Sequence, residues 1–197
     1  MIKLKEQLTK KNILNALFIS LLLLLVFVPA AKALLIGGLI EIGIFNPTVN
    51  EELAHVTADL SGIKFKDAKG RVVSLSELKG KVIFINFWAT WCPPCLAEMK
   101  SIYRFYEQFK QDDEVVFLMV DADSDFKKAQ AYMARKKYDL PVYNFASDLP
   151  ETIFKGTLPT TVVFDKKGRL SFHREGAANY ASPKFIAFIN KLKTASD

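Results

Sequence analysis

The chain begins with a pattern of charge and apolarity that is typical of a membrane-directing segment. Residues 13–31 carry no charge and are almost all apolar, and the flank before them holds four lysines against one glutamate. A helix of this length covers about 28 Å, close to the thickness of a bilayer's hydrocarbon core. The pattern predicts a basic cytoplasmic flank over 1–12 and a single spanning helix over 13–31.

A second apolar stretch, residues 34–45, has Glu41 as its one charged residue. It could extend the helix, lie along the membrane interface or cover part of the folded domain. The small residues of "AKA" at 31–33 leave a cleaved signal peptide open, but the apolar run exceeds the roughly 7 to 15 residues of a signal core and favours an anchor. By the positive-inside rule, the rest of the chain then lies in the periplasm or at the outer surface of a bacterium, where disulfides form.

After a juxtamembrane segment over 32–56, short apolar runs alternate with polar turns from residue 57 to residue 197. This texture predicts one globular domain. It opens with a hairpin around "DAKG", in which Gly70 supplies the turn. Two runs rich in β-forming residues follow, each with the pattern of a buried strand and each succeeded by an amphipathic helix, and this order implies parallel pairing with right-handed crossovers.

The remaining elements complete an α/β order. A hairpin turns at "KKG", and a last helix is capped by Ser182 with Pro183 in its first turn. The expected elements after the first hairpin are strands over 81–89 and 114–123, helices from the cysteines to about 109 and from 124 to about 138, a hairpin over 160–175 and a helix over 182–192.

The first of these helices has an apolar stripe at three- and four-residue spacing. We expect this stripe to pack in the core and the charged residues of the helix, Glu98 among them, to fall on other faces. The stripe consists of Leu96, Met99, Tyr103, Tyr106 and Phe109.

Composition and charge exclude some classes of function. Half of the 197 residues are apolar, so a core can form without disulfide bonds. The formal charge of +6 is spread over interspersed acidic and basic residues, and no basic stripe with interleaved aromatic residues stands out. Nucleic-acid binding is therefore not expected.

The two cysteines of the chain stand in "FWATWCPPC", residues 87–95. Cys92 falls where a buried strand passes into a helix, and Pro93 and Pro94 occupy the first turn, where their missing N–H groups are not needed. The helix N-terminus favours a thiolate at Cys92, which we expect to be the nucleophile. Cys95, one turn further and more buried, is then the resolving cysteine. A redox-active disulfide between them is expected, with no cofactor.

Other uses of the two cysteines fit the residues less well. A structural disulfide over so short a loop would remove little unfolded-state entropy, and a zinc or iron–sulfur site lacks a second cysteine pair. Leu96 stands where covalent haem attachment needs a histidine, and the threonine spacing of a peroxide-reducing site is missing. His55 and His173 are lone histidines in ordinary contexts, which favours surface or partly packed positions for both.

The motif "FWATWCPPC" at a strand-to-helix junction, with "GTLPTTVVFDKKGRL" downstream, resembles the thioredoxin superfamily, and in particular its membrane-anchored TlpA/ResA branch of bacterial thiol-disulfide oxidoreductases. The resemblance covers about residues 57–195. It implies a thioredoxin-like α/β fold, with a central mixed sheet flanked by helices and an N-terminal hairpin extension. It also implies that the cysteine motif is exposed at the tip of the long helix.

The resemblance adds client-binding residues to the two cysteines. Pro159 matches the family's cis-proline, and the backbone of Leu158 would pair with an extended client segment. Trp91 matches the aromatic residue before the first cysteine and would shape the apolar surface around the sulfur. With Pro93 and Pro94, these are the residues expected to contact clients.

Glu98 gains a role by the same resemblance. The TlpA/ResA branch often has a glutamate three residues after the second cysteine, and Glu98 stands there. Asn86 occupies the position of thioredoxin's buried aspartate and cannot titrate. Glu98 is therefore the expected general base for Cys95, against the alternative of a solvated carboxylate on the helix surface. Many relatives also have a helix-kinking proline where this chain has Lys100.

The resemblance implies protein thiols and disulfides as substrates and favours a reductant supplied by a transmembrane electron donor, as in cytochrome c assembly. Two alternatives stay open. The protein could be an oxidant that installs disulfides in secreted proteins, or it could handle copper through both cysteines with His173 as third ligand.

Overall fold

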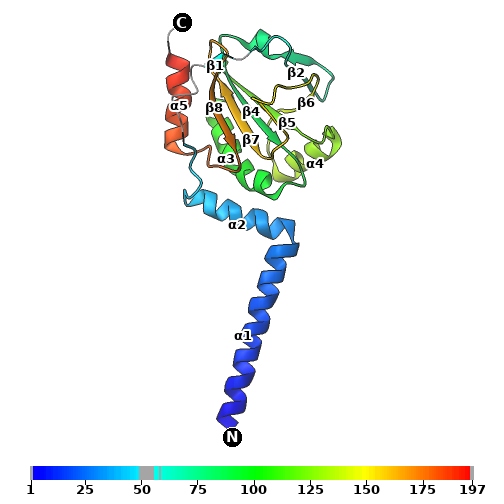
Figure 1. The fold of residues 1–197 in the computed structure, drawn as a ribbon, viewed down its shortest axis with the longest axis vertical. Helices are drawn as coiled ribbons and strands as arrows, with labels where there is room; N and C mark the ends of the chain where they lie inside the picture. Colours follow the sequence, from blue (N-terminus) through cyan, green and yellow to red (C-terminus); the bar gives the residue numbers. More distant parts are fainter. Residues whose placement is uncertain (1, 49–55, 58, 196–197) are drawn as a thin grey trace.

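The computed structural model describes residues 2–48, 56–57 and 59–195. A long helix, α1 (Ile2–Phe27), forms a stalk, and α2 (Pro29–Glu41) runs across its end beneath an α/β domain (Figure 1). The segment expected to link the anchor and the domain over 32–56 is therefore helical as far as Glu41. His55, expected to be at the surface or partly packed, lies outside the described residues.

The described strands form one mixed sheet in the order β1-β8-β7-β4-β5-β6-β2-β3. The β4–β5 and β5–β6 pairs are parallel and the other pairs are antiparallel. The strands are Val56–Thr57 (β1), Lys64–Asp67 (β2), Val72–Ser74 (β3), Val82–Trp88 (β4), Val115–Asp121 (β5), Val142–Phe145 (β6), Thr160–Phe164 (β7) and Arg169–Glu175 (β8).

The predicted order of elements is confirmed, with two additions. The helices of the domain are α3 (Pro93–Phe109), α4 (Phe126–Lys136) and α5 (Pro183–Thr194), with a 3₁₀ turn over Leu75–Leu78. Strands β1 and β6 were not predicted. β6 is short and half-buried, and it becomes a strand because it bridges β5 of the parallel core to β2 of the N-terminal hairpin. Neither partner can be read from four residues of local sequence.

The central strand β4 sends alternate side chains to two separate cores. Val82, Phe84 and Trp88 pack with α3, α4 and α5, whereas Ile83, Ile85 and Phe87 pack on the opposite side of the sheet. That opposite side is covered by the chain around Leu60 and Ile63, by the 3₁₀ turn and by the loop that carries Ile153. The same alternation places Asn86 on the side of α3.

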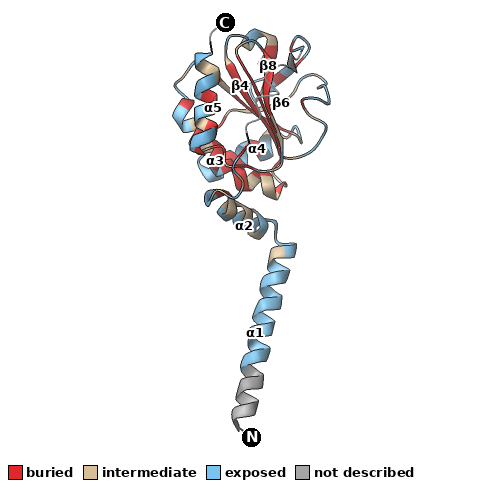
Figure 2. Cartoon of the chain, turned by 60° about the vertical axis from the view of Figure 1, so that its left-hand side comes forward, coloured by how far each residue is buried: buried red, intermediate tan, exposed pale blue. Residues whose placement is uncertain are grey.

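The expected core stripe of α3 is confirmed in its packing, although its members are unequally buried (Figure 2). Met99 and Phe109 are buried, and the other three members are half-buried against the helix-side core. The expected placement of Glu98 among exposed charges is wrong, because its side chain is fully buried. The loop between β8 and α5 covers that side of α3, and the periodicity of α3 alone contains no information about this loop.

The stalk and the domain meet through α2. The helix breaks at Val28 because Pro29 has no N–H group to continue the ladder of α1 and starts a new helix. The apolar segment 13–31 is thus divided between α1 and α2. The apolar stretch 34–45 covers part of the folded domain, since α2 packs against α3 and Ile40 is buried there.

Candidate active site

The cysteine motif starts α3 directly after β4, as the sequence predicts. Cys92 is the N-cap in extended conformation; its Sγ accepts from the N–H of Cys95 at 3.3 Å and its carbonyl from the N–H of Leu96 at 3.1 Å. Pro93 and Pro94 occupy the first two helical positions. A disulfide joins Cys92 to Cys95. The first turn of α3 thus holds both sulfurs at the positive end of the helix dipole.

The cysteines are less accessible than the family resemblance implies. Cys92 is 3% exposed and Cys95 is fully buried, so the expectation of an exposed motif is wrong for the sulfurs themselves. The reason is packing, since both cysteines belong to the helix-side core. The greater burial of Cys95 agrees with its predicted role as the resolving cysteine.

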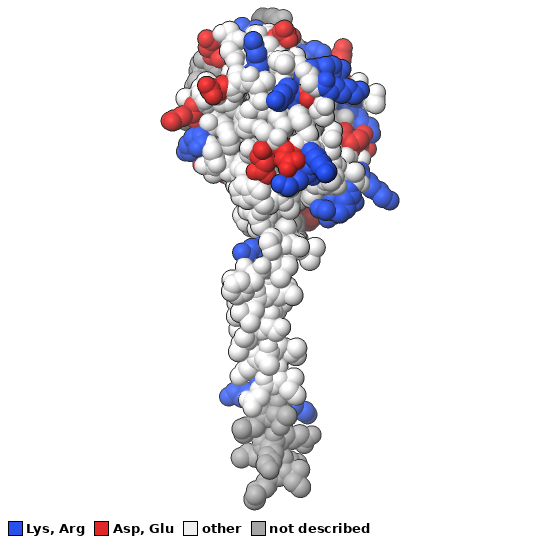
Figure 3. Space-filling view, turned by 90° about the vertical axis from the view of Figure 1, so that its right-hand side faces the viewer, with Lys and Arg blue, Asp and Glu red and all other residues white. Residues whose placement is uncertain are grey.

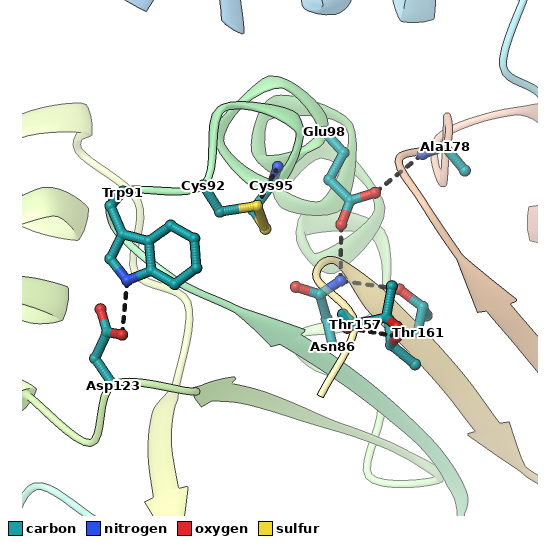
Figure 4. Close-up of a disulfide and its surroundings, with 10 residues drawn as sticks. Asn86, Trp91, Cys92, Cys95, Glu98, Asp123, Thr157, Thr161 and Ala178 are labelled. Carbon is teal, nitrogen blue, oxygen red and sulfur yellow. Dashed lines mark hydrogen bonds between the residues drawn. A yellow bond between two sulfur atoms is a disulfide. The ribbon is translucent and has the colours of Figure 1, made fainter. Parts of the chain in front are cut away.

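Trp91 is the exposed part of the motif, with 64% of its surface accessible. Its indole Nε1 donates to Asp123 Oδ1 at 2.7 Å, which holds the ring beside the disulfide (Figure 4). Asp123 stands in the loop that follows β5. That loop is fixed by the carboxylate of Asp121, which accepts from the N–H groups of Asp123 and Asp125.

Asp123 was missed by the sequence reasoning, although a signal for it exists. β4 and β5 are parallel neighbours, so the segments that follow them meet at one edge of the sheet, which is where α/β folds build their sites. A polar residue two positions after β5 is therefore a candidate partner for a residue that follows β4.

Behind Cys95, the side chain of Glu98 points into the space between α3 and the sheet (Figure 4). Its Oε1 accepts from Asn86 Nδ2 at 2.8 Å, and its Oε2 accepts from the N–H of Ala178 at 2.9 Å. The Asn86 amide also donates to Thr161 Oγ1 at 2.9 Å, across the β4–β7 pair. The alternative of a solvated Glu98 carboxylate is thereby excluded.

Burial controls the acidity of this carboxyl group. Loss of hydration raises the pKa of Glu98 from 4.5 to about 8, against the opposing effects of the hydrogen bonds from Asn86 and Ala178 and of the Arg174 charge. A carboxyl group with such a pKa exchanges its proton near neutrality, which is what a general acid or base requires.

The loop that buries Glu98 is held on α3 by Ser101. The Ser101 hydroxyl donates to the Ala178 carbonyl at 3.1 Å and accepts from the N–H of Tyr180 at 3.2 Å. Ala178, Tyr180 and Arg174 were all missed by the sequence reasoning. No signal could have found them, because their link to Glu98 is made of main-chain groups and long-range charge.

The cis isomer expected at Pro159 is confirmed for the Leu158–Pro159 bond. Thr160 pairs with Phe87, so Pro159 lies at the end of β4 that leads to Cys92. Leu158 is half-buried and packs against both cores, one of which contains the two cysteines. The pairing of its backbone with a client stays a prediction.

Among the described residues, no group of three or more histidine, cysteine, aspartate or glutamate side chains is arranged to hold a metal ion. His173 lies on β8, opposite Val162 of β7, and β7 separates β8 from β4. The copper-handling alternative needs a third ligand beside the sulfurs, and the described residues provide no structural support for one.

A disulfide that opens a helix at the edge of a mixed sheet, with a buried acid behind its second sulfur, is the arrangement of the thioredoxin superfamily. The class that this fold and site define is a thiol-disulfide oxidoreductase. A family model described as Redoxin matches residues 49–184, more than half of the chain, and the chain belongs to that family.

Similar proteins agree with the TlpA/ResA resemblance. The thiol-disulfide oxidoreductase ResA of Bacillus cereus is 32% identical over 124 residues, which cover 61% of this chain and 70% of the relative. ResA of Halalkalibacterium halodurans is 27% identical over 142 residues, covering 71% and 80%. A solved putative thiol-disulfide oxidoreductase from Bacteroides vulgatus is 25% identical with a TM-score of 0.58, covering 73% of this chain and 99% of that one. StoA from Bacillus subtilis shares the fold at 21% identity, with a TM-score of 0.52, covering 68% and 98%.

Proposed function

We propose that this protein is anchored in a bacterial membrane by α1 and reduces disulfides of protein clients on the extracytoplasmic side. The observation that carries the proposal is the Cys92–Cys95 disulfide at the start of α3 with the fully buried Glu98 behind it. The candidate span Lys10–Phe27, none of which is buried against the protein, supports the anchoring. The lysines before it support a cytoplasmic N-terminus.

In the proposed cycle, the reduced enzyme attacks with the Cys92 thiolate. It forms a mixed disulfide with one client sulfur, and the other client sulfur leaves as a thiolate. Cys95 then loses its proton and attacks the Cys92 sulfur, which breaks the mixed disulfide and releases the second client thiolate. Two electrons pass from the enzyme dithiol to the client disulfide, and the enzyme is left oxidised.

Glu98 is the proposed acceptor of the Cys95 proton. It stands one helical turn after Cys95, and with a pKa of about 8 its carboxyl group holds a proton at neutral pH in the oxidised enzyme. That protonated state is the one expected after the resolving step. The carboxyl group has no hydrogen bond to sulfur in the oxidised state, where neither sulfur carries a proton.

Asn86 can support Glu98 in both protonation states. With its Nδ2 towards Glu98, the amide donates to an ionised carboxylate. Its Oδ1 has no hydrogen-bond partner among the described residues. Rotation of the amide by a half-turn would direct this oxygen to the proton of a neutral Glu98 and to the hydroxyl of Thr161. A buried aspartate at this position would instead place a second negative charge beside Glu98.

Clients would contact the exposed Trp91 ring and the half-buried Pro93 and Pro94, and would extend along the backbone of Leu158 before Pro159. A transmembrane electron donor would return the disulfide to the dithiol, since each cycle consumes two electrons. The relatives named ResA are described as thiol-disulfide oxidoreductases, a name that supports disulfide exchange. The reductant direction is proposed from the resemblance to the TlpA/ResA branch.

The test is to trap the client. In a Cys95→Ser variant, Cys92 can attack but cannot be released, so we expect a mixed disulfide with the client that mass spectrometry can identify. Cys92→Ser is the matched control and should trap nothing by this route. If the Cys95→Ser variant traps no partner in the native membrane, the exchange function is contradicted.

The reduction potential separates the reductant from the oxidant. A reductant should have a potential near or below that of thioredoxin, about −270 mV, whereas an oxidant should lie near −120 mV. Equilibration of the disulfide with glutathione buffers measures this value, and a potential close to the second figure would reverse the proposed direction.

A further inference from the structure

We propose that α2 is an interfacial helix whose exposed apolar face inserts into an anionic bilayer surface while its opposite face holds the catalytic domain. This inference rests on the proposed anchoring of α1. Since α2 begins two residues after α1 ends, a membrane-spanning α1 delivers α2 to the bilayer surface. Figure 1 shows that α2 turns away from the line of α1 and lies across its end.

One face of α2 is committed to the domain. Ile40 is buried, and an added Cβ at Gly37 would lie 3.6 Å from the carbonyl oxygen of Ala97 on α3. The chain after α2 is tied down as well, because Asn179 Nδ2 donates to the Ile40 carbonyl and its N–H donates to the Phe45 carbonyl at 2.9 Å.

Ion pairs reinforce the same contact. The Glu41 carboxylate accepts from Arg104 at 2.8 Å and lies 3.4 Å from the Lys100 ammonium group. These partners are one and two turns further along α3 than Ala97. The contact between the two helices is therefore specific in register.

The opposite face of α2 is apolar and has no protein cover. At 3.6 residues per turn, Leu35 points away from Gly37 and Ile40, and Leu34 lies at the edge of this face, next to Gly37. Ile42 follows α2 directly as its C-cap. Leu34 is 81% exposed, Leu35 is 52% exposed and Ile42 is 72% exposed. Exposed leucine and isoleucine side chains on one face of a helix that begins at a membrane are typical of interfacial helices.

This apolar face looks back towards the stalk. The angle between the two helices encloses a hollow of about 450 Å³, to which α1 contributes Leu21, Leu24 and Leu25. The residues of α2 that line the hollow are Ala31, Leu34, Leu35, Gly38 and Leu39. An uncharged hollow between a spanning helix and the helix above it fits lipid chains and headgroup carbons, because these are what surround α1 on that side.

Basic side chains lie beside α2, and they favour lipids with anionic headgroups. A groove of about 640 Å³ between α2 and the domain is lined by Lys100, which pairs with Glu41 of the same groove, and by Arg135 and Lys136. Lys32 of α2 is exposed nearby in the chain. Cations beside an inserted helix favour anionic headgroups. Figure 3 shows that the stalk is nearly free of charged side chains, whereas charges of both signs cover the domain.

The consequence concerns where the chemistry happens. The carbonyl of Ala97, which faces Gly37 of α2, is two residues from Cys95, so the disulfide lies within one helical turn of this contact along the axis of α3. A domain held in this way presents its reactive cysteines beside the bilayer. Clients and the electron donor would then meet them at the membrane surface.

The inference can be tested by fluorescence quenching in the full chain, reconstituted in nanodiscs that contain lipids brominated on their acyl chains. Leu35→Trp adds a reporter on the exposed face of α2, with Ile42→Trp as a second exposed position directly after the helix. Leu21→Trp reports on α1, and Val72→Trp, equally exposed on the distant hairpin strand β3, is the matched control. Each variant should keep the disulfide-exchange activity of the parent protein. The fluorescence of Trp88 and Trp91, measured in the parent protein, is the background to subtract.

We expect the added fluorescence of Leu35→Trp and Leu21→Trp to be largely lost and that of Val72→Trp to be retained. Quenching of Leu21→Trp without quenching at Leu35 or Ile42 overturns the inference and leaves the anchor intact. An unquenched Leu21→Trp overturns the anchoring itself. Adding phosphatidylglycerol to phosphatidylcholine nanodiscs should increase the quenching at Leu35, and equal quenching in both overturns the role of the cations.

Discussion

The two sides of the disulfide each hold a carboxyl group, and the two groups differ in burial. In front, Asp123 lies in a surface loop and accepts the indole N–H of the exposed Trp91. Behind, Glu98 is fully buried and receives its hydrogen bonds from Asn86 and the Ala178 main chain. Burial raises the pKa of Glu98 to about 8.

This difference separates positioning from proton transfer. The Asp123 carboxylate lies at the surface, and its hydrogen bond from the indole orients a neighbouring side chain. A desolvated carboxyl group can exchange a proton in the neutral range, because water no longer favours its charged form. In the proposed cycle, the acid behind the resolving cysteine therefore takes part in proton transfer, whereas the acid in front orients the ring that is proposed to contact clients.

The largest expected effect is on the resolving step. Glu98→Gln removes the titrating group, and we expect release of a mixed-disulfide client to slow by roughly 10²- to 10⁴-fold, the usual contribution of a general base. In the parent, the rate should rise with pH and level off above about 8, where Glu98 is ionised. Stopped-flow measurement of client release across pH checks both expectations.

Glu107→Gln is the control for this experiment, because Glu107 stands on the outer surface of the same helix and pairs with Lys110. Its pH profile should match that of the parent. A Glu98→Gln profile that also matches the parent would remove Glu98 from the mechanism.

A smaller effect is expected on stability. In the folded protein the Glu98 pKa is about 8, above the value of 4.5 that represents the unfolded chain, so between these pH values the folded state holds a proton that the unfolded state has released. The contribution of this group to the free energy of unfolding is therefore fully present below 4.5 and falls as pH rises to about 8. The slope is at most about 1.4 kcal/mol per pH unit.

Urea unfolding of the oxidised full chain at several pH values, followed by tryptophan fluorescence, measures this slope. We expect it to be shallower in Glu98→Gln than in the parent and in Glu107→Gln. Equal slopes in all three proteins would mean that the buried carboxyl group does not titrate in this range.

The smallest effect is expected from changing Asp123, on the exposed side of the disulfide. Asp123→Ala frees the Trp91 ring and should raise the KM for a protein client by about fivefold or less, equivalent to about 1 kcal/mol, with kcat unchanged. Asp123→Asn keeps an oxygen acceptor and should restore most of the loss. A change in kcat or in its pH profile would instead place Asp123 in the chemistry and abolish the contrast with Glu98.

Local patterns were sufficient for much of the fold. The β-forming run before the cysteines, the two prolines after Cys92 and the glycines of the two hairpins each have a local physical cause, and the elements they predict are present. β6 was not predicted, because it forms a strand by pairing with β2 and β5, which are distant in sequence. The cis bond at Pro159 came from family resemblance, since local sequence only weakly biases such a bond.

The site divides in the same way. By itself, the sequence determined that two cysteines lie at the start of a helix, their order along it and a candidate membrane span, because helix capping, spacing and apolar length act within a few residues. The tertiary structure alone decided that Glu98 is buried, that Asp123 holds Trp91 and that α2 packs on α3. Burial and hydrogen bonding depend on which distant segments cover a residue, and here the loop between β8 and α5, about 80 residues further along the chain, buries the Glu98 carboxyl group and raises its pKa to about 8.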